Sequence, residues 1–128
     1  MQHPVPTPRR CYCFGQAIGR AIASFPTDEK VVILGAGGMS HQLDGKRPGF
    51  INKSFDLMCM EKIVGDPEAL AKISSHELIR EAGAQRLEFI LWLTMRGCLN
   101  GKVKRLHQNY HIPISNTAAG TLLLENAA

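Results

Sequence analysis

Hydrophobic and polar positions along the chain follow first a helical pattern and then a strand-like one. Alternating prolines over residues 3–8 predict an extended start, because proline fixes the backbone and cannot continue a helix. Residues 9–25 carry apolar side chains at a loose helical period. The β-branched run 31–34 predicts a short buried strand, and the polar, glycine-rich residues 36–53 that follow predict a loop.

Helices are predicted over much of the middle of the chain. The first runs to about Val64 and the second is short. A third ends at Gly83, and residues 85–98 form the most apolar helix. In the third helix Glu77 completes a capping box if the helix begins after Ser74. The signals for the first three starts are Ser54, Pro67, and Ser74 or Ser75.

The C-terminal part of the chain predicts two extended segments joined by a turn. Residues 103–114 and 118–124 are the extended segments, and 115–117 form the turn. Strands that alternate with helices indicate an α/β fold with a central sheet and flanking helices. We expect residues 1–128 to form one domain.

Composition narrows the class of protein. The chain has 128 residues, 45% of them hydrophobic, and a net charge of +4, which excludes a disordered tail or a coiled-coil rod. No apolar run approaches the roughly 18–20 residues that span a bilayer. We see no signal peptide either, so we expect no membrane partner and a cytoplasmic location. The basic clusters are short, so we expect no nucleic-acid partner. We interpret the four cysteines as reduced and mostly packed in the core.

The glycine-rich segment after the predicted strand allows two kinds of chemistry. Phosphate binding is disfavoured, because Ser40 stands where the third glycine of a dinucleotide-binding loop would fall. Alternatively, the glycines leave room for a ligand and aim His41 into a cavity at the end of the strand. From the pattern alone, a flexible turn with a surface histidine is somewhat favoured.

Glu88 is a second candidate, because it shares a predicted helical face with Leu91, Trp92 and Met95. A carboxylate in apolar surroundings needs an arginine, a hydrogen-bond network or a metal ion. The structural alternative is a first-turn glutamate that is stabilised by the helix dipole or paired with Arg86.

The remaining histidines are weaker candidates. His107 and His111 are four residues apart, but in an extended segment that spacing separates them by about 13 Å, so a zinc site is disfavoured. We expect surface roles for His3 and His76.

Taken together, several motifs resemble those of the class III extradiol ring-cleaving dioxygenases, above all the β subunits of protocatechuate 4,5-dioxygenases and the gallate dioxygenases. The resemblance covers nearly the whole chain and implies the C-terminal part of that β-subunit fold. The motifs that carry it are 37–42, 49–53, 81–83, 88–93, 114–118 and 122–125.

The resemblance also implies a chemistry. The family opens a catecholic acid such as protocatechuate or gallate with O₂ and non-haem Fe(II), which is held by two histidines and one glutamate. By position in the motifs, Glu88 matches the glutamate ligand and His41 matches an acid/base residue near the diol. Ser115 matches a residue that helps to bind the substrate carboxylate.

Both iron-binding histidines of the family belong to its N-terminal half, which this sequence does not contain. We therefore expect the C-terminal portion of a catalytic subunit, a truncated product, a split half or a fragment, that is inactive by itself. Expected partners are the catecholic acid and O₂, and either the missing N-terminal half or a small α subunit. The alternative is a non-catalytic module that pairs with a dioxygenase subunit through its apolar helix.

Overall fold

A computed structural model describes residues 4–43 and 45–127 of the chain, with Gln85 described only in its backbone. Helices and one antiparallel sheet make up the regular structure, which confirms the α/β class. In chain order the elements are α1 (Pro8–Ala23), α2 (Lys53–Gly65), α3 (Pro67–Ala71), α4 (Ser75–Ala82), the 3₁₀ helix η1 (Ala84–Phe89), α5 (Ile90–Cys98), β1 (Val103–His111) and β2 (Ala119–Asn126).

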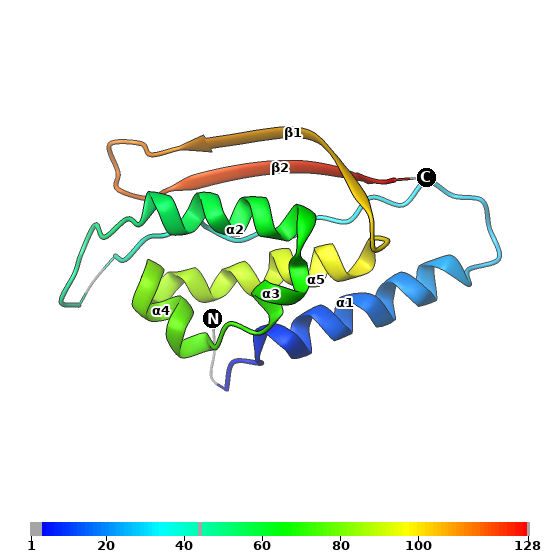
Figure 1. Cartoon of the computed structure of the whole chain (residues 1–128), viewed down its shortest axis with the longest axis horizontal. Helices are drawn as coiled ribbons and strands as arrows, with labels where there is room; N and C mark the ends of the chain where they lie inside the picture. The colour runs from blue at the N-terminus through cyan, green and yellow to red at the C-terminus, as the bar shows by residue number, and fades with distance from the viewer. Residues whose placement is uncertain (1–3, 44, 128) are drawn as a thin grey trace.

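The elements form layers, with the β1–β2 hairpin along one side and α1 on the opposite side (Figure 1). Helices α2, α4 and α5 lie between them. Helix α1 packs against α5 through two glycines: a Cβ at Gly15 would lie only 3.0 Å from the Cα of Gly97. The absence of side chains at these positions therefore lets the two backbones approach closely.

The main core lies where α2, α5 and the hairpin meet the loop that precedes α2. Buried side chains from all of these segments close it against water, which supplies most of the stabilisation of such a small protein. Its buried members are Met39, Cys59, Met60, Ile63, Leu70, Phe89, Trp92, Leu93 and Ala118.

The sheet is smaller than the sequence predicts. Strands β1 and β2 pair antiparallel from Val103↔Asn126 to His111↔Ala119, and an irregularity lies between Arg105 and His107. The expected buried strand at 31–34 is wrong. These residues form no strand and make no backbone hydrogen bond with other described residues.

The side chains of that segment are also exposed, with 73% of Val32 and 89% of Leu34 accessible to solvent. A β-branched run favours a strand, but a strand is buried only when neighbouring strands pair with it. No described segment pairs with residues 31–34 in this way.

Three helix boundaries refine the expectations. Asn52, not Ser54, caps α2, and its side chain accepts a hydrogen bond from the backbone N–H of Phe55 at 3.1 Å. Ser74 caps α4 as the capping box predicts. The expected single helix over 85–98 is divided into η1 and α5.

None of the helices in the described part of the chain combines the length and the apolar character needed to cross a membrane.

Candidate functional site

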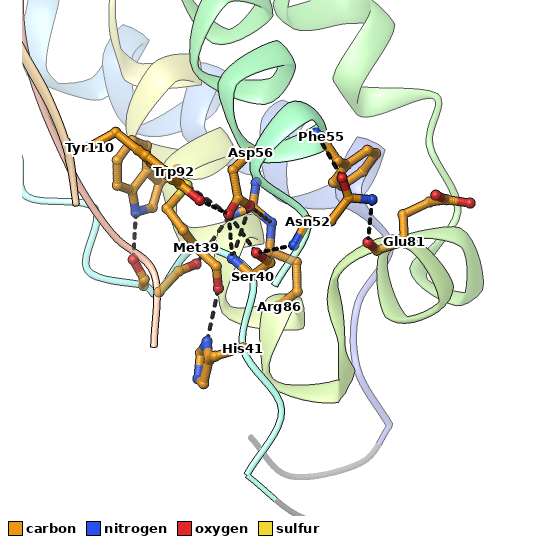
Figure 2. A network of polar contacts seen from close by, with 12 residues as sticks. Met39, Ser40, His41, Asn52, Phe55, Asp56, Glu81, Arg86, Trp92 and Tyr110 are labelled. Carbon is orange, nitrogen blue, oxygen red and sulfur yellow. Dashed lines mark hydrogen bonds and ion pairs between the residues drawn. The ribbon is translucent and has the colours of Figure 1, made fainter. Parts of the chain in front are cut away.

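The loop Gly37–His41 is held by hydrogen bonds from several elements (Figure 2). The indole N–H of Trp92, on α5, donates to the carbonyl of Gly37 at 3.0 Å. The Arg86 guanidinium, on η1, donates to the carbonyl of Gly38 at 3.1 Å. These two donors fix the glycine pair against the η1–α5 segment.

The second half of the loop is fixed by backbone contacts. Met39 N–H donates to the carbonyl of Ala118, and Ala118 N–H donates to the carbonyl of Ser40, both at 3.3 Å. His41 N–H donates to the carbonyl of Ala82 at 3.1 Å. The loop is therefore a rigid element and not the flexible turn that the glycines favour.

Asp56, on the first turn of α2, is the centre of a buried polar network. Both of its carboxylate oxygens accept from the backbone N–H of Ser40, at 2.9 and 3.0 Å. One oxygen also accepts from the Ser40 hydroxyl at 2.6 Å and from the Tyr110 hydroxyl at 2.8 Å. The Ser40 hydroxyl in turn accepts from Asn52 N–H at 2.9 Å, so the start of α2 is tied to the loop.

Arg86 provides the positive charge beside this carboxylate. Its Nε lies 3.7 Å from Asp56 Oδ1, and both side chains are completely buried. The guanidinium carbon also lies 3.9 Å from the centre of the Phe89 ring, where the π electrons attract a cation. The Arg86–Glu88 pair considered from the sequence is therefore wrong: Arg86 pairs with Asp56.

Tyr110, on β1, stays protonated over the ordinary pH range. Burial raises the pKa of its phenol, and the hydrogen bond to the Asp56 carboxylate raises that pKa further. The phenol is therefore a donor that connects the sheet to α2.

His41 is buried, with 8% of its surface exposed, so the interpretation as a surface histidine is wrong. Its Nδ1 lies 2.8 Å from the carbonyl oxygen of Met39. A carbonyl can only accept, so we assign the proton of the neutral ring to Nδ1. Nε2 then keeps a lone pair that can take a proton or bind a metal ion.

Glu88 lies on η1, beside the same glycine pair. A Cβ at Gly37 would lie 3.2 Å from the Cβ of Glu88, and a Cβ at Gly38 would lie 2.6 Å from Cε1 of His41. The two candidates thus flank two consecutive residues that lack side chains. Glu88 is half-buried, and no hydrogen bond or ion pair joins its carboxylate to a described residue.

Ser115 lies in the turn between β1 and β2 and is exposed. It is three residues before Ala118, which pairs with the loop that carries His41. A Cβ at Gly49 would lie 3.2 Å from the side-chain nitrogen of Asn116, so this turn also contacts the segment before α2. Its role in binding a substrate carboxylate stays a prediction.

The other predicted candidates lie away from this loop. His107 and His111 are exposed on β1, and His76 is exposed on α4, whereas His3 lies outside the described residues. Cys11 and Cys59 are buried and all four cysteines are free, but Cys13 is exposed. Among the described residues, no group of three or more His, Cys, Asp or Glu side chains is placed to hold a metal ion.

The residues that the sequence interpretation missed are those that build the loop. Asp56 is not among the predicted candidates, and Arg86 is considered only as a partner of Glu88. A carboxylate and a guanidinium in largely apolar helical segments were the available signal, since each needs a partner when buried. Because Asp56 and Arg86 are 30 positions apart in the sequence, no local pattern predicts that they pair.

Comparisons with known proteins show the family of the chain. Residues 1–120 match the family model described as "Catalytic LigB subunit of aromatic ring-opening dioxygenase". The chain is also 47% identical over 126 residues, 98% of its length, to a gallate dioxygenase of Pseudomonas putida. It spans 37% of the length of that relative. The chain belongs to the family of catalytic LigB subunits of aromatic ring-opening dioxygenases.

Proposed function

We propose that the chain forms part of the catalytic centre of an Fe(II)-dependent extradiol dioxygenase that opens a catecholic acid such as gallate or protocatechuate. In this proposal Glu88 is an iron ligand, His41 is an acid/base residue and Ser115 contacts the substrate carboxylate. Family membership and the likeness to a gallate dioxygenase support the reaction class. The observation that carries the site is the buried His41, whose Nε2 is available on a rigid loop beside an unpaired Glu88.

His41 suits proton transfer with a phenolic substrate. The Met39 carbonyl fixes the ring and its tautomer, so Nε2 can accept a proton from a hydroxyl and return it later in the reaction. The loop hydrogen bonds keep the ring in one place, which a general base needs in order to act on a bound diol.

The chemistry of Glu88 fits one of the three protein ligands of an iron site. Glu88 offers a carboxylate that no described side chain neutralises, and a metal ion is one partner that makes its partial burial tolerable. A bound ferrous ion would supply open coordination positions for the diol and for O₂. The other two ligands would come from a missing N-terminal half, and a small α subunit is a further partner that the proposal allows.

Iron binding tests the argument about ligands. We expect the 128-residue chain to bind Fe(II) weakly or not at all under anaerobic titration, because a single carboxylate does not retain the ion. Tight, stoichiometric binding that survives Glu88→Ala would contradict the proposal.

Activity is tested by producing the chain together with the remaining part of the Pseudomonas putida gallate dioxygenase. We expect oxygen uptake and ring opening with gallate or protocatechuate. His41→Gln should reduce the rate about 10²–10⁴-fold, as expected for loss of a general acid/base, while the exposed His76→Gln serves as the matched control. A stable complex that consumes no oxygen would favour a non-catalytic module, and full activity in His41→Gln would remove the proposed role of that residue.

A further inference from the structure

The exposed segment Lys30–Ala36 and strand β2 face each other across a cavity. The cavity has a volume of about 730 Å³, and its lining includes all of residues 30–36 and 120–126. Trp92 and Met95 of α5 also line it. In Figure 1 the segment, drawn in cyan, follows the line of β2 and runs in the opposite direction.

The two extended backbones converge at one end of this cavity. There Met39 and Ser40 exchange backbone hydrogen bonds with Ala118, directly before β2. Further along, the segment lies on α5 instead: a Cβ at Gly35 would be 2.9 Å from the carbonyl oxygen of Leu91. Because α5 fixes the segment, it separates from β2 and leaves the space between them.

Both walls of the cavity are edges that can take another strand. Within the described part of the chain, β2 pairs with β1 along one edge and with no strand along the other. On the other wall, residues 31–34 make no backbone hydrogen bond with described residues. Their side chains are also exposed: 52% of Val31, 73% of Val32 and 89% of Leu34 is accessible to solvent. An extended apolar segment with unpaired backbone groups is a template for strand addition.

We propose that a β-strand from the remainder of a LigB-type catalytic subunit inserts into this groove. It would pair with β2 on one side and with residues 31–34 on the other. Since the two walls run in opposite directions, the inserted strand would be parallel to one and antiparallel to the other, forming a mixed sheet.

The remainder of the subunit is the occupant because the matched relative is much longer, with this chain spanning 37% of its length. In a second copy, the strand edges among the described residues lie on β1, on β2 and on the segment 30–36, and each of these is anchored within its own molecule. Apolar surface also continues past the groove, because Val31 lines a neighbouring cavity with Ile22 and Phe25. The inference rests on family membership and on the proposed incompleteness of the chain, and it does not depend on the iron site.

Proline substitutions in the exposed segment test the strand pairing. Adjacent amides of an extended chain point to opposite sides, so only one of Val31 and Val32 can donate into the groove. Val31→Pro and Val32→Pro each remove one amide N–H, whereas Val31→Thr and Val32→Thr keep it as matched controls. Neither valine makes a backbone hydrogen bond with another described residue, so the fold should be retained.

The binding probes are two. One is the part of the Pseudomonas putida gallate dioxygenase outside its matched 126 residues, co-produced with the tagged 128-residue chain. The other is a set of overlapping peptides of about ten residues, long enough to contain a typical strand, that cover the same part. We expect co-purification, binding of at least one peptide, and hydrogen-exchange protection of residues 31–34 and 120–126 together.

One proline variant should weaken binding about tenfold or more through the loss of a strand hydrogen bond and its neighbours. The other proline variant and both threonine variants should bind nearly as well as the parent.

Binding by neither probe would overturn the proposal. Equal weakening by all four variants would also overturn it, because it indicates apolar burial without strand pairing. A homodimer that Val32→Pro dissociates would identify a second copy as occupant and would also overturn it. Binding without oxygen uptake would support the groove and contradict the proposed function.

Discussion

Two neighbouring parts of the segment before α2, residues 31–34 and 37–41, differ sharply in burial and in backbone hydrogen bonding. Residues 37–41 are half-buried or buried, and hydrogen bonds with five other elements or segments hold their backbone. Residues 31–34 are apolar but largely exposed, and their backbone makes no hydrogen bond with the described residues. The described residues thus fix the His41 loop but leave most of the side chains of residues 31–34 exposed.

The largest expected effect comes from removing the centre of the network. Asp56→Ala leaves the buried Arg86 guanidinium without its carboxylate and Ser40 N–H without its acceptor. We expect the free energy of unfolding to fall by about 3–5 kcal/mol, as for other broken buried ion pairs. Urea denaturation measures this loss.

A surface ion pair provides the control for that experiment. Glu61 is exposed and contacts Arg105, so Glu61→Ala should change the free energy of unfolding by only about 0–1 kcal/mol. Equal losses for Asp56→Ala and Glu61→Ala would show that the network does not hold the loop.

Tyr110→Phe has a smaller effect that depends on pH. Near pH 7 it removes one hydrogen bond to a charged acceptor and should cost about 1.5 kcal/mol, since the site is only half-buried. The folded state raises the pKa of this phenol, so its contribution is complete below the unfolded pKa of about 10 and is lost as the pH rises above it.

The stabilities of the parent and of Tyr110→Phe should therefore converge above pH 10. Urea denaturation at a series of pH values gives the difference directly. A difference that widens with rising pH would mean that the phenol does not donate to Asp56.

Gly38→Ala should disturb the position of the His41 ring, because the three atoms nearest to a Cβ at Gly38 all belong to that ring. The new methyl group would lie 2.6 Å from Cε1 of the imidazole, so the ring must move and its bond to the Met39 carbonyl is weakened. We expect a loss of about 1 kcal/mol in stability and a changed NMR signal for His41. An unchanged His41 signal would contradict the placement of this ring over Gly38.

Local signals explain how much of the fold the sequence predicts. Ser74 caps α4 through its side-chain oxygen as the capping box predicts, and the two C-terminal strands overlap the extended segments expected at 103–114 and 118–124. These features depend on neighbours in the chain, so a single sequence is enough. The cap at Asn52 was missed because Ser54 is an equally good cap residue two positions later.

Features that depend on distant partners could not be predicted in the same way. Residues 31–34 have the composition of a buried strand, but no described segment pairs with them. Similarly, the motif resemblance pointed to His41 and Glu88, whereas the Asp56–Arg86 pair that positions the loop required the three-dimensional structure. The sequence therefore suggested candidate site residues, whose roles stay predictions, but it did not show the buried pair that supports the loop.

The smallest expected effect completes the comparison. Val32→Ser removes an apolar side chain that is 73% exposed and contacts no core cluster, so the free energy of unfolding of the chain should change by less than about 0.5 kcal/mol. The same denaturation assay as for Asp56→Ala measures it. If Val32→Ser instead destabilises the chain by several times that amount, residues 31–34 are already packed within this chain, and the contrast with the His41 loop disappears. A negligible change would agree with the contrast, because a side chain that is 73% exposed contributes almost nothing to the fold of the described residues.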